Sequence, residues 1–303
     1  MRMGLKGIVV AGMTPLTERG AVRLELIPDL LEHYRHEGVT AVYALGSTGE
    51  GPSLTGSERR AVAEAWVEAS AGRLPVLVQV GHNSLAEARE LAAHAQGIGA
   101  DAISMHLPGY FKPSSAEAAA ACLAEVGAGA PDLPLLYYHI PALTGVELDL
   151  IDLLDAARDR APTLAGVKFT DPRLHELQAA AAHYGEALDL LFGCDEMLLE
   201  GLVAGAAGAV GSTYNFGMPI YRRVLDAYGG GDLEQARLWQ GRAVEMIRVI
   251  LRHGGNAAIK ATMRLAGHDC GPTRLPQVAL GGAAEASLRT ALDRIGFFGW
   301  IDG

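Results

Sequence analysis

The sequence predicts an α/β fold, a closed (β/α)8 TIM barrel followed by a C-terminal helical subdomain. Eight short apolar runs begin at intervals of roughly 20 to 34 residues, the spacing of βα units. Segments of helical character separate them, and after residue 220 the pattern becomes wholly helical. The eight strands are expected within residues 7–15, 41–47, 75–81, 102–108, 134–141, 166–171, 190–196 and 208–215.

The composition of each run supports this assignment. The strand candidates are almost continuously apolar, as expected for parallel strands covered on both faces. Between them, residues 57–70 and 85–99 have the apolar spacing of amphipathic helices. An open, doubly wound sheet is the competing fold. The Gly-rich stretches 46–51 and 205–211 do not support it, because neither has a Walker A pattern or the strand-turn-helix placement of a dinucleotide loop.

The last part of the chain is predicted to be helical throughout. Residues 233–254 form one long amphipathic pattern, and two more helices are expected around 256–267 and 283–296. Pro272 and Pro276 interrupt the chain between those two helices. Because no Ser- or Pro-rich linker precedes this region, we expect it to pack on the barrel. The predicted division is residues 1–222 for the barrel and 223–303 for the helical subdomain.

Composition excludes several classes of function. The chain has 303 residues, half of them hydrophobic, and a formal net charge of −10. An acidic chain without a basic run is a poor candidate for binding nucleic acid or an anionic membrane. No secretory signal and no apolar stretch of about 18 residues is apparent, so we expect no membrane span. Three scattered cysteines fit neither disulfide nor zinc spacing, and they favour the reducing cytoplasm.

Lys168 is the first candidate for chemistry, because it interrupts the apolar run 166–171. A lysine is rarely buried without a partner, since moving an ammonium out of water is costly. The alternative is an edge-strand lysine whose stem covers apolar surface while its amine reaches water. A desolvated amine is more readily uncharged and can form a Schiff base with a ketone. The protonated imine then accepts electrons from a breaking carbon–carbon bond, which is the chemistry of a lysine-dependent aldolase.

Polar residues gather where the predicted strands end. In TIM barrels the functional residues lie at the C-terminal ends of the strands. Lys168 and Thr170 share one face of their strand, and only one of Tyr137 and Tyr138 can face the barrel interior. A tyrosine there could carry the protons that the aldolase reaction needs. The other polar strand ends are Ser47, Thr48, Asp195, Glu196, Ser212 and Thr213.

Each of these residues also has a purely structural explanation. Asp195 and Glu196 could cap the helix that follows their strand. Ser212 and Thr213 could be turn residues. Tyr138 could be a core aromatic residue with a satisfied hydroxyl.

Six stretches of the sequence closely resemble the N-acetylneuraminate lyases, in the superfamily that also holds dihydrodipicolinate synthase. They occur in order along the chain: GSTGEG (46–51), YYHIPALTG (137–145), GVKFTD (166–171), FGCDE (192–196), GAVGSTYNF (208–216) and GPTRLPQ (271–277). The resemblance implies a pyruvate-dependent class I aldolase that reversibly cleaves N-acetylneuraminate to pyruvate and N-acetylmannosamine. It also implies a homotetramer that needs no metal and no organic cofactor.

The same resemblance implies a role for each site residue. Lys168 resembles the Schiff-base lysine and Tyr138 the proton-relay tyrosine. Ser47 and Thr48 resemble the pair that holds the pyruvate carboxylate, with Ser47 also in the proton path. Tyr110 resembles a tyrosine offered across a subunit contact. The positions that contact the sugar-derived polyol are matched by Thr170, Gly193, Asp195, Glu196 and Ser212, and carboxylates suit vicinal hydroxyls.

Two alternatives stay open at the level of sequence. The first is another enzyme of the superfamily, a dihydrodipicolinate synthase or a 2-keto-3-deoxy sugar acid aldolase. In the synthase branch an arginine usually lies five residues after the relay tyrosine, and here that position is Leu143, which argues against that branch. The second is a catalytically silent binder of sugar acids, since fold does not fix function.

Overall fold

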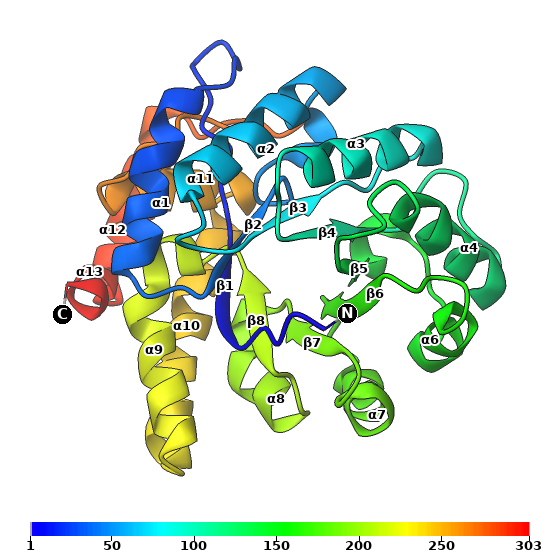
Figure 1. Cartoon of the computed structure of the whole chain (residues 1–303). Helices are drawn as coiled ribbons and strands as arrows, with labels where there is room; N and C mark the ends of the chain where they lie inside the picture. Colours follow the sequence, from blue (N-terminus) through cyan, green and yellow to red (C-terminus); the bar gives the residue numbers. More distant parts are fainter. Residues whose placement is uncertain (1, 303) are drawn as a thin grey trace.

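Eight short apolar segments form parallel strands that close into one barrel, in a computed structural model that describes residues 2–302. Each strand pairs with the next along the chain, and β1 pairs with β8 to complete the ring (Figure 1). The strands are β1 Gly7–Ala11, β2 Ala41–Ala44, β3 Val76–Gln79, β4 Ala102–Met105, β5 Leu135–His139, β6 Leu164–Phe169, β7 Asp189–Phe192 and β8 Gly208–Gly211. The predicted fold class and all eight strands are confirmed.

The predicted strands run too far at their C-terminal ends. The strand expected at 190–196, for example, ends at Phe192, and the one expected at 208–215 ends at Gly211. The residues beyond those ends form the loops of the barrel mouth. The sequence there stays partly apolar, although the backbone has already left the strand ladder.

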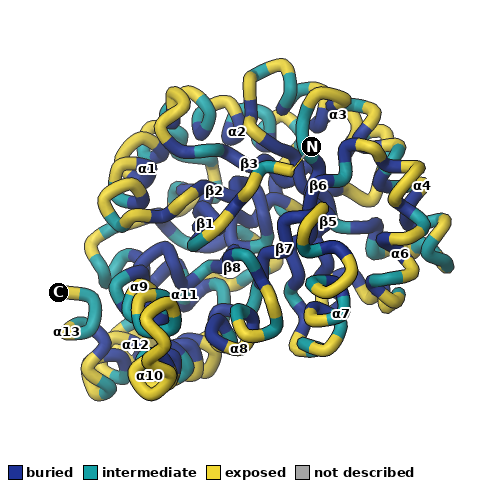
Figure 2. Tube along the Cα trace, turned by 60° about the horizontal axis from the view of Figure 1, so that its bottom comes forward, coloured by how far each residue is buried: buried dark blue, intermediate teal, exposed yellow. Residues whose placement is uncertain are grey.

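Helices surround the barrel on its outside (Figures 1 and 2), and the buried residues form two clusters, one inside the ring of strands and one between strands and helices. The barrel helices are α1 Ile27–His36, α2 Gly56–Ser70, α3 Leu85–Gly97, α4 Ala116–Gly127, α6 Leu150–Ala157, α7 Leu174–Tyr184, α8 Leu198–Val203 and α9 Tyr214–Gly229, with the short α5 Pro141–Thr144 after β5. Helix α2 begins with a capping box in which Thr55 and Glu58 satisfy each other's backbone N–H groups.

The start of the chain closes the bottom of the barrel. The buried carboxylate of Asp189, at the first position of β7, accepts hydrogen bonds from Arg2 Nε at 2.7 Å and from the backbone N–H groups of Met3 and Gly4. Leu5 packs into the inner cluster at the same end. The C-terminal ends of the strands are thereby left as the functional face.

The tail forms α10 Leu233–Arg252, α11 Asn256–Leu265, α12 Gly282–Arg294 and α13 Phe297–Ile301, the last of which was not predicted. Helix α10 packs along α9, and α11 and α12 pack against α10 and against each other. The predicted domain boundary at residue 222 falls inside α9, a continuous helix, and the division into two domains stays a prediction. Within residues 2–302, no helix is both long enough and apolar enough to cross a membrane.

Candidate active site at the barrel mouth

Lys168 lies near the C-terminal end of β6, with its side chain inside the barrel and only 3% exposed. Its Nζ lies 4.0 Å from the ring centroid of Tyr43 and 4.0 Å from that of Tyr138. Within residues 2–302, no carboxylate comes within ion-pair distance of this amine. The edge-strand alternative is therefore wrong, because the amine faces aromatic rings at the centre of the mouth and does not reach out along the surface.

Tyr138 is the tyrosine of β5 that faces the barrel interior. It is paired directly with Lys168 in the β5–β6 ladder and belongs to the inner cluster, whereas Tyr137 belongs to the outer one. The Tyr138 hydroxyl lies 3.5 Å from Ser47 Oγ. Strand register thus places Tyr138 beside Lys168 on the inner face of neighbouring strands, and the loop after β2 brings Ser47 to the Tyr138 hydroxyl from across the barrel.

The loop that carries Ser47 and Thr48 has a constrained backbone. Leu45 and Glu50, which flank it, both have positive φ, at 63° and 54°. Such conformations cost free energy in residues other than glycine and persist only where the surroundings hold them. Gly46 has no room for a side chain, because a Cβ there would lie 2.7 Å from Tyr43 Cε1.

The tail of the chain holds this loop in place. Glu50 Oε1 lies 2.7 Å from Lys260 Nζ, an ion pair in which both side chains are buried. Lys260 also donates to Pro272 O, and the backbone N–H of Arg274 donates to Glu50 Oε2 at 2.8 Å. Arg274 in turn makes two hydrogen bonds to the carboxylate of Glu58. The conformation of the loop therefore depends on residues more than 200 positions away.

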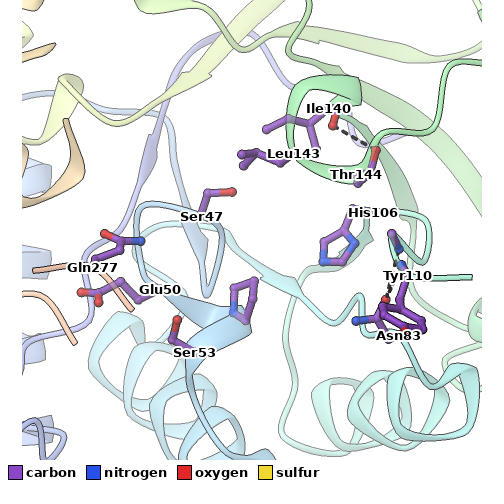
Figure 3. Close-up of a pocket in the computed structure, with 12 residues that line it drawn as sticks. Ser47, Glu50, Ser53, Asn83, His106, Tyr110, Ile140, Leu143, Thr144 and Gln277 are labelled. Carbon is purple, nitrogen blue, oxygen red and sulfur yellow. Dashed lines mark hydrogen bonds between the residues drawn. The ribbon is translucent and has the colours of Figure 1, made fainter. Parts of the chain in front are cut away.

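A cavity of about 470 Å³ opens beside these residues. Figure 3 shows Ser47 and Gln277 on one side of it and His106, Tyr110 and Thr144 on the other. Burial lowers the pKa of His106, so its imidazole is neutral near pH 7. Ile140 and Leu143 add apolar surface. A pocket with mostly fixed walls and a few convergent polar groups is typical of small-molecule sites.

The predicted polyol-binding residues come from β6, β7 and β8. Thr170 follows β6, and its buried Oγ1 has no hydrogen-bond partner within residues 2–302. Gly193 lies against it, since a Cβ on Gly193 would meet Thr170 Oγ1 at 1.9 Å. Glu196 is exposed and Ser212 is half-buried. An unpaired hydroxyl that is buried among polar neighbours is a candidate for hydrogen bonding to a ligand.

Asp195 takes part in the structure of the mouth itself. It is 5% exposed, and its Oδ2 accepts hydrogen bonds from the backbone N–H and the hydroxyl of Thr213, at 2.8 and 2.7 Å. This contact joins the ends of β7 and β8. Its carboxylate also fills the space beside Gly211, where a Cβ would lie 1.6 Å from Oδ1. Neither the helix-cap nor the polyol-contact explanation anticipated this bond, and polyol contact by Asp195 stays a prediction.

Thr48 is buried within the constrained loop, whereas Tyr110 is 79% exposed at the outer edge of the cavity. Tyr110 packs edge-on against Phe111, which is 85% exposed. The backbone N–H of Tyr110 donates a hydrogen bond to Asn83 Oδ1. Tyr110 therefore belongs to the rim of the cavity and not to the buried group formed by Lys168, Tyr138 and Tyr43.

Sequence reasoning missed Tyr43, His106, the Glu50–Lys260 pair and Gln277. The one signal available for Tyr43 and His106 was strand parity, because each shares the face of its strand with residues that line the barrel interior. That signal does not tell which inward-facing side chain meets Lys168 across the barrel. Within the described residues, no three His, Cys, Asp or Glu side chains form a group that could hold a metal ion.

Known proteins match the chain over its whole length. The Dihydrodipicolinate synthetase family profile matches residues 4–295. The N-acetylneuraminate lyase of Rattus norvegicus is 41% identical, over 99% of this chain and 96% of the relative. The structure of the Proteus mirabilis N-acetylneuraminate lyase superposes with a TM-score of 0.93 at 35% identity, covering 97% of this chain and 99% of that one. A dihydrodipicolinate synthase structure superposes with a TM-score of 0.87 at 25% identity, over 96% and 99% of the two chains.

The buried carboxyl of Asp195 predicts a pH-dependent stability. Burial raises its pKa from 3.8 to about 6. The folded protein then binds this proton more tightly than the unfolded chain, so stability falls as the pH rises through that range. We expect Asp195→Asn to remove the effect. From about pH 4 to about pH 7, the free energy of unfolding of the variant should rise relative to wild type, by up to about 3 kcal/mol.

Urea unfolding at several pH values measures this difference. Glu196→Gln, which changes the exposed neighbour, is the matched control and should leave the pH dependence in place. Parallel stability curves for Asp195→Asn and wild type would contradict the assignment.

Proposed function

The chain belongs to the Dihydrodipicolinate synthetase family, and from that membership we propose that it is a class I aldolase that reversibly cleaves N-acetylneuraminate to pyruvate and N-acetylmannosamine. The observation that carries the proposal is the Lys168 amine, buried beside Tyr138 at the mouth of the barrel. The similarity to N-acetylneuraminate lyases at about 40% identity over the full length supports the choice of substrate.

The proposed reaction begins with attack of Lys168 Nζ on the C2 carbonyl of the sugar acid. The C2 oxygen leaves as water, and a protonated imine remains. The C4 hydroxyl gives its proton to the Tyr138–Ser47 relay, in which Tyr138 passes its own proton on as it takes the new one, and the C3–C4 bond breaks. The proton held by the relay is the one later returned at C3. The electrons of that bond move toward the imine nitrogen, which gives the amino sugar aldehyde and an enamine on Lys168. Protonation at C3 and hydrolysis then release pyruvate.

The contrast between two buried lysines supports the choice of nucleophile. Lys260 is 2% exposed, but it is fixed by the Glu50 carboxylate at 2.7 Å and by Pro272 O. A carboxylate at that distance holds an amine in its charged form. Lys168 faces two rings, which leaves its amine free to react with a ketone.

The substrate contacts are part of the proposal. Ser47 and Thr48 would hold the carboxylate of the pyruvate moiety, and the constrained loop supports this, because its conformation is fixed before substrate binds. Thr170, Gly193, Glu196 and Ser212 would contact the polyol, together with Asp195. The unpaired hydroxyl of Thr170 is the strongest support for that side.

The assembly and compartment are also proposals. A homotetramer is implied by the family resemblance, with Tyr110 at a subunit contact. The exposed aromatic pair Tyr110–Phe111 at the cavity edge supports it, since large exposed apolar groups mark interaction surfaces. Sedimentation velocity would show a monomer if this is wrong. The free thiols of Cys122, Cys194 and Cys270 support the cytoplasm as the compartment.

Trapping with borohydride tests the proposed chemistry directly. With pyruvate present, we expect one reduced adduct per chain, located at Lys168 by peptide mass mapping and absent in Lys168→Ala. Lys260, the other buried lysine, is an internal control that should stay unlabelled. An unlabelled wild-type protein, or a label on Lys260, would refute the aldolase assignment.

A panel of aldehydes with pyruvate tests the substrate. N-acetylmannosamine should be condensed in preference to aspartate semialdehyde, because Leu143 offers no charge to a second carboxylate. The opposite preference would assign the chain to the synthase branch.

Tyr138→Phe separates proton transfer from imine formation. The substitution keeps the ring beside Lys168 and removes only the hydroxyl. We expect kcat to fall by about 100-fold or more, since general acid–base catalysis contributes at least that much. The KM for pyruvate should change by less than about threefold. Comparable losses in kcat and in pyruvate binding would remove the relay role from Tyr138.

A further inference from the structure

Tyr43 contacts the reactive amine from the opposite side of the barrel. It is fully buried on β2, and the face of its ring lies 4.0 Å from Lys168 Nζ. The Tyr138 ring lies at the same distance, and the two rings meet edge to face, with an interplanar angle of 77°. The amine is thus enclosed by two aromatic faces that belong to strands distant in the sequence.

The hydroxyl of Tyr43 is committed to a structural role. It donates to Ser104 Oγ at 2.9 Å, and Ser104 donates to Leu136 O at 3.0 Å. Burial raises the pKa of Tyr43 well above its ordinary value, so the phenol stays neutral. The ring is also held beneath Gly46, where a Cβ would lie 2.7 Å from Cε1. Tyr43 is therefore fixed, and its hydroxyl is not available as a proton carrier.

Imine formation places a positive charge where the rings converge. The amine nitrogen bonds to C2, and the C2 oxygen leaves as water after taking one proton from nitrogen and one from solvent. The product carries one positive charge on the nitrogen of Lys168, a residue that is only 3% exposed. The negative face of an aromatic ring stabilises such a charge, and more strongly when water is excluded.

Asp195 is a buried acid near Lys168, but its carboxylate already accepts two hydrogen bonds from Thr213. The rings are thus the groups in direct contact with the developing charge. An interaction that is stronger with the imine cation than with the free amine favours the covalent intermediate.

We propose that the ring face of Tyr43 stabilises the protonated imine on Lys168, which makes Tyr43 a catalytic residue that acts through its π-electrons. The inference rests on the proposed function, because it concerns the imine that this function requires. Tyr138 supplies a second face, but its hydroxyl also serves the proton relay. Tyr43 is therefore the position at which the effect of the ring can be measured alone.

The experiment measures the pyruvate concentration that gives half-maximal borohydride trapping. Tyr43→Phe keeps the face and should require no more than about three times the wild-type concentration. Tyr43→Leu removes the face and should require at least about ten times as much. Tyr137→Leu removes a buried aromatic residue from the outer side of β5 and is the matched control, expected to stay within about threefold of wild type.

A graded series covers the case in which Tyr43→Leu fails to fold. Phenylalanine with one, two or three ring fluorines at position 43 keeps nearly the same shape while the negative face weakens with each fluorine. The half-maximal concentration should rise stepwise along the series. A constant value would overturn the proposal, because a purely packing role does not depend on ring electrons.

The two proposals fail in different ways. If pyruvate leaves the wild-type protein unlabelled, the aldolase function itself is wrong. If wild type is labelled at Lys168 but the fluorinated series and Tyr43→Leu match Tyr43→Phe, only the role of Tyr43 is wrong.

Discussion

The site depends on one constraint, which is that the Lys168 amine is buried at the centre of the barrel with no carboxylate of residues 2–302 at ion-pair distance. Burying a charge costs free energy unless it is paired, and Lys260 shows the ordinary solution in this same chain, an ion pair with Glu50. Lys168 instead contacts the faces of Tyr43 and Tyr138. In the proposed reaction these uncharged rings favour the protonated imine, and no carboxylate is left uncompensated when the amine reacts.

The second constraint concerns the loop that presents Ser47 and Thr48. Its two flanking residues, Leu45 and Glu50, have backbone conformations that are unfavourable in isolation. The buried pair Glu50–Lys260 and the hydrogen bond from Arg274 hold the end of this loop. A buried ion pair is weak evidence for stability, because desolvation offsets most of its attraction. In this chain the more evident effect of the pair is to fix the backbone of the loop that carries Ser47 and Thr48. Because Lys260 lies on α11, the C-terminal helices contribute directly to the shape of the site.

The polar residues at the C-terminal ends of β6, β7 and β8 differ in whether they already bond within the protein. Asp195 joins β7 to β8 through Thr213, whereas the buried hydroxyl of Thr170 has no hydrogen-bond partner within residues 2–302. Contacts of Thr170, Glu196 and Ser212 with a polyol are part of the proposed function. The cavity on the other side, with His106, Thr144 and Gln277, adds neutral hydrogen-bonding groups. A site with one reactive amine, neutral donors and few exposed charges suits a polyhydroxylated keto acid better than a substrate with two carboxylates.

The sequence by itself determined what short-range periodicity can encode. The eight strands, their order, the shared face of Lys168 and Thr170 and the helical tail could be predicted from it, because strand parity and helix spacing are local properties. Whether that face points into the barrel or outward was left open. The adjacency of the fifth and sixth strands brought one of Tyr137 and Tyr138 near Lys168, and the family resemblance selected Tyr138. Only the tertiary structure decided that Tyr43 faces Lys168, that Lys260 pairs with Glu50 and that Asp195 binds Thr213. Those contacts depend on how the barrel closes and how the tail packs, and no local sequence pattern specifies either. Many inward-facing residues share the same strand parity, so only three-dimensional packing selects the pairs that meet.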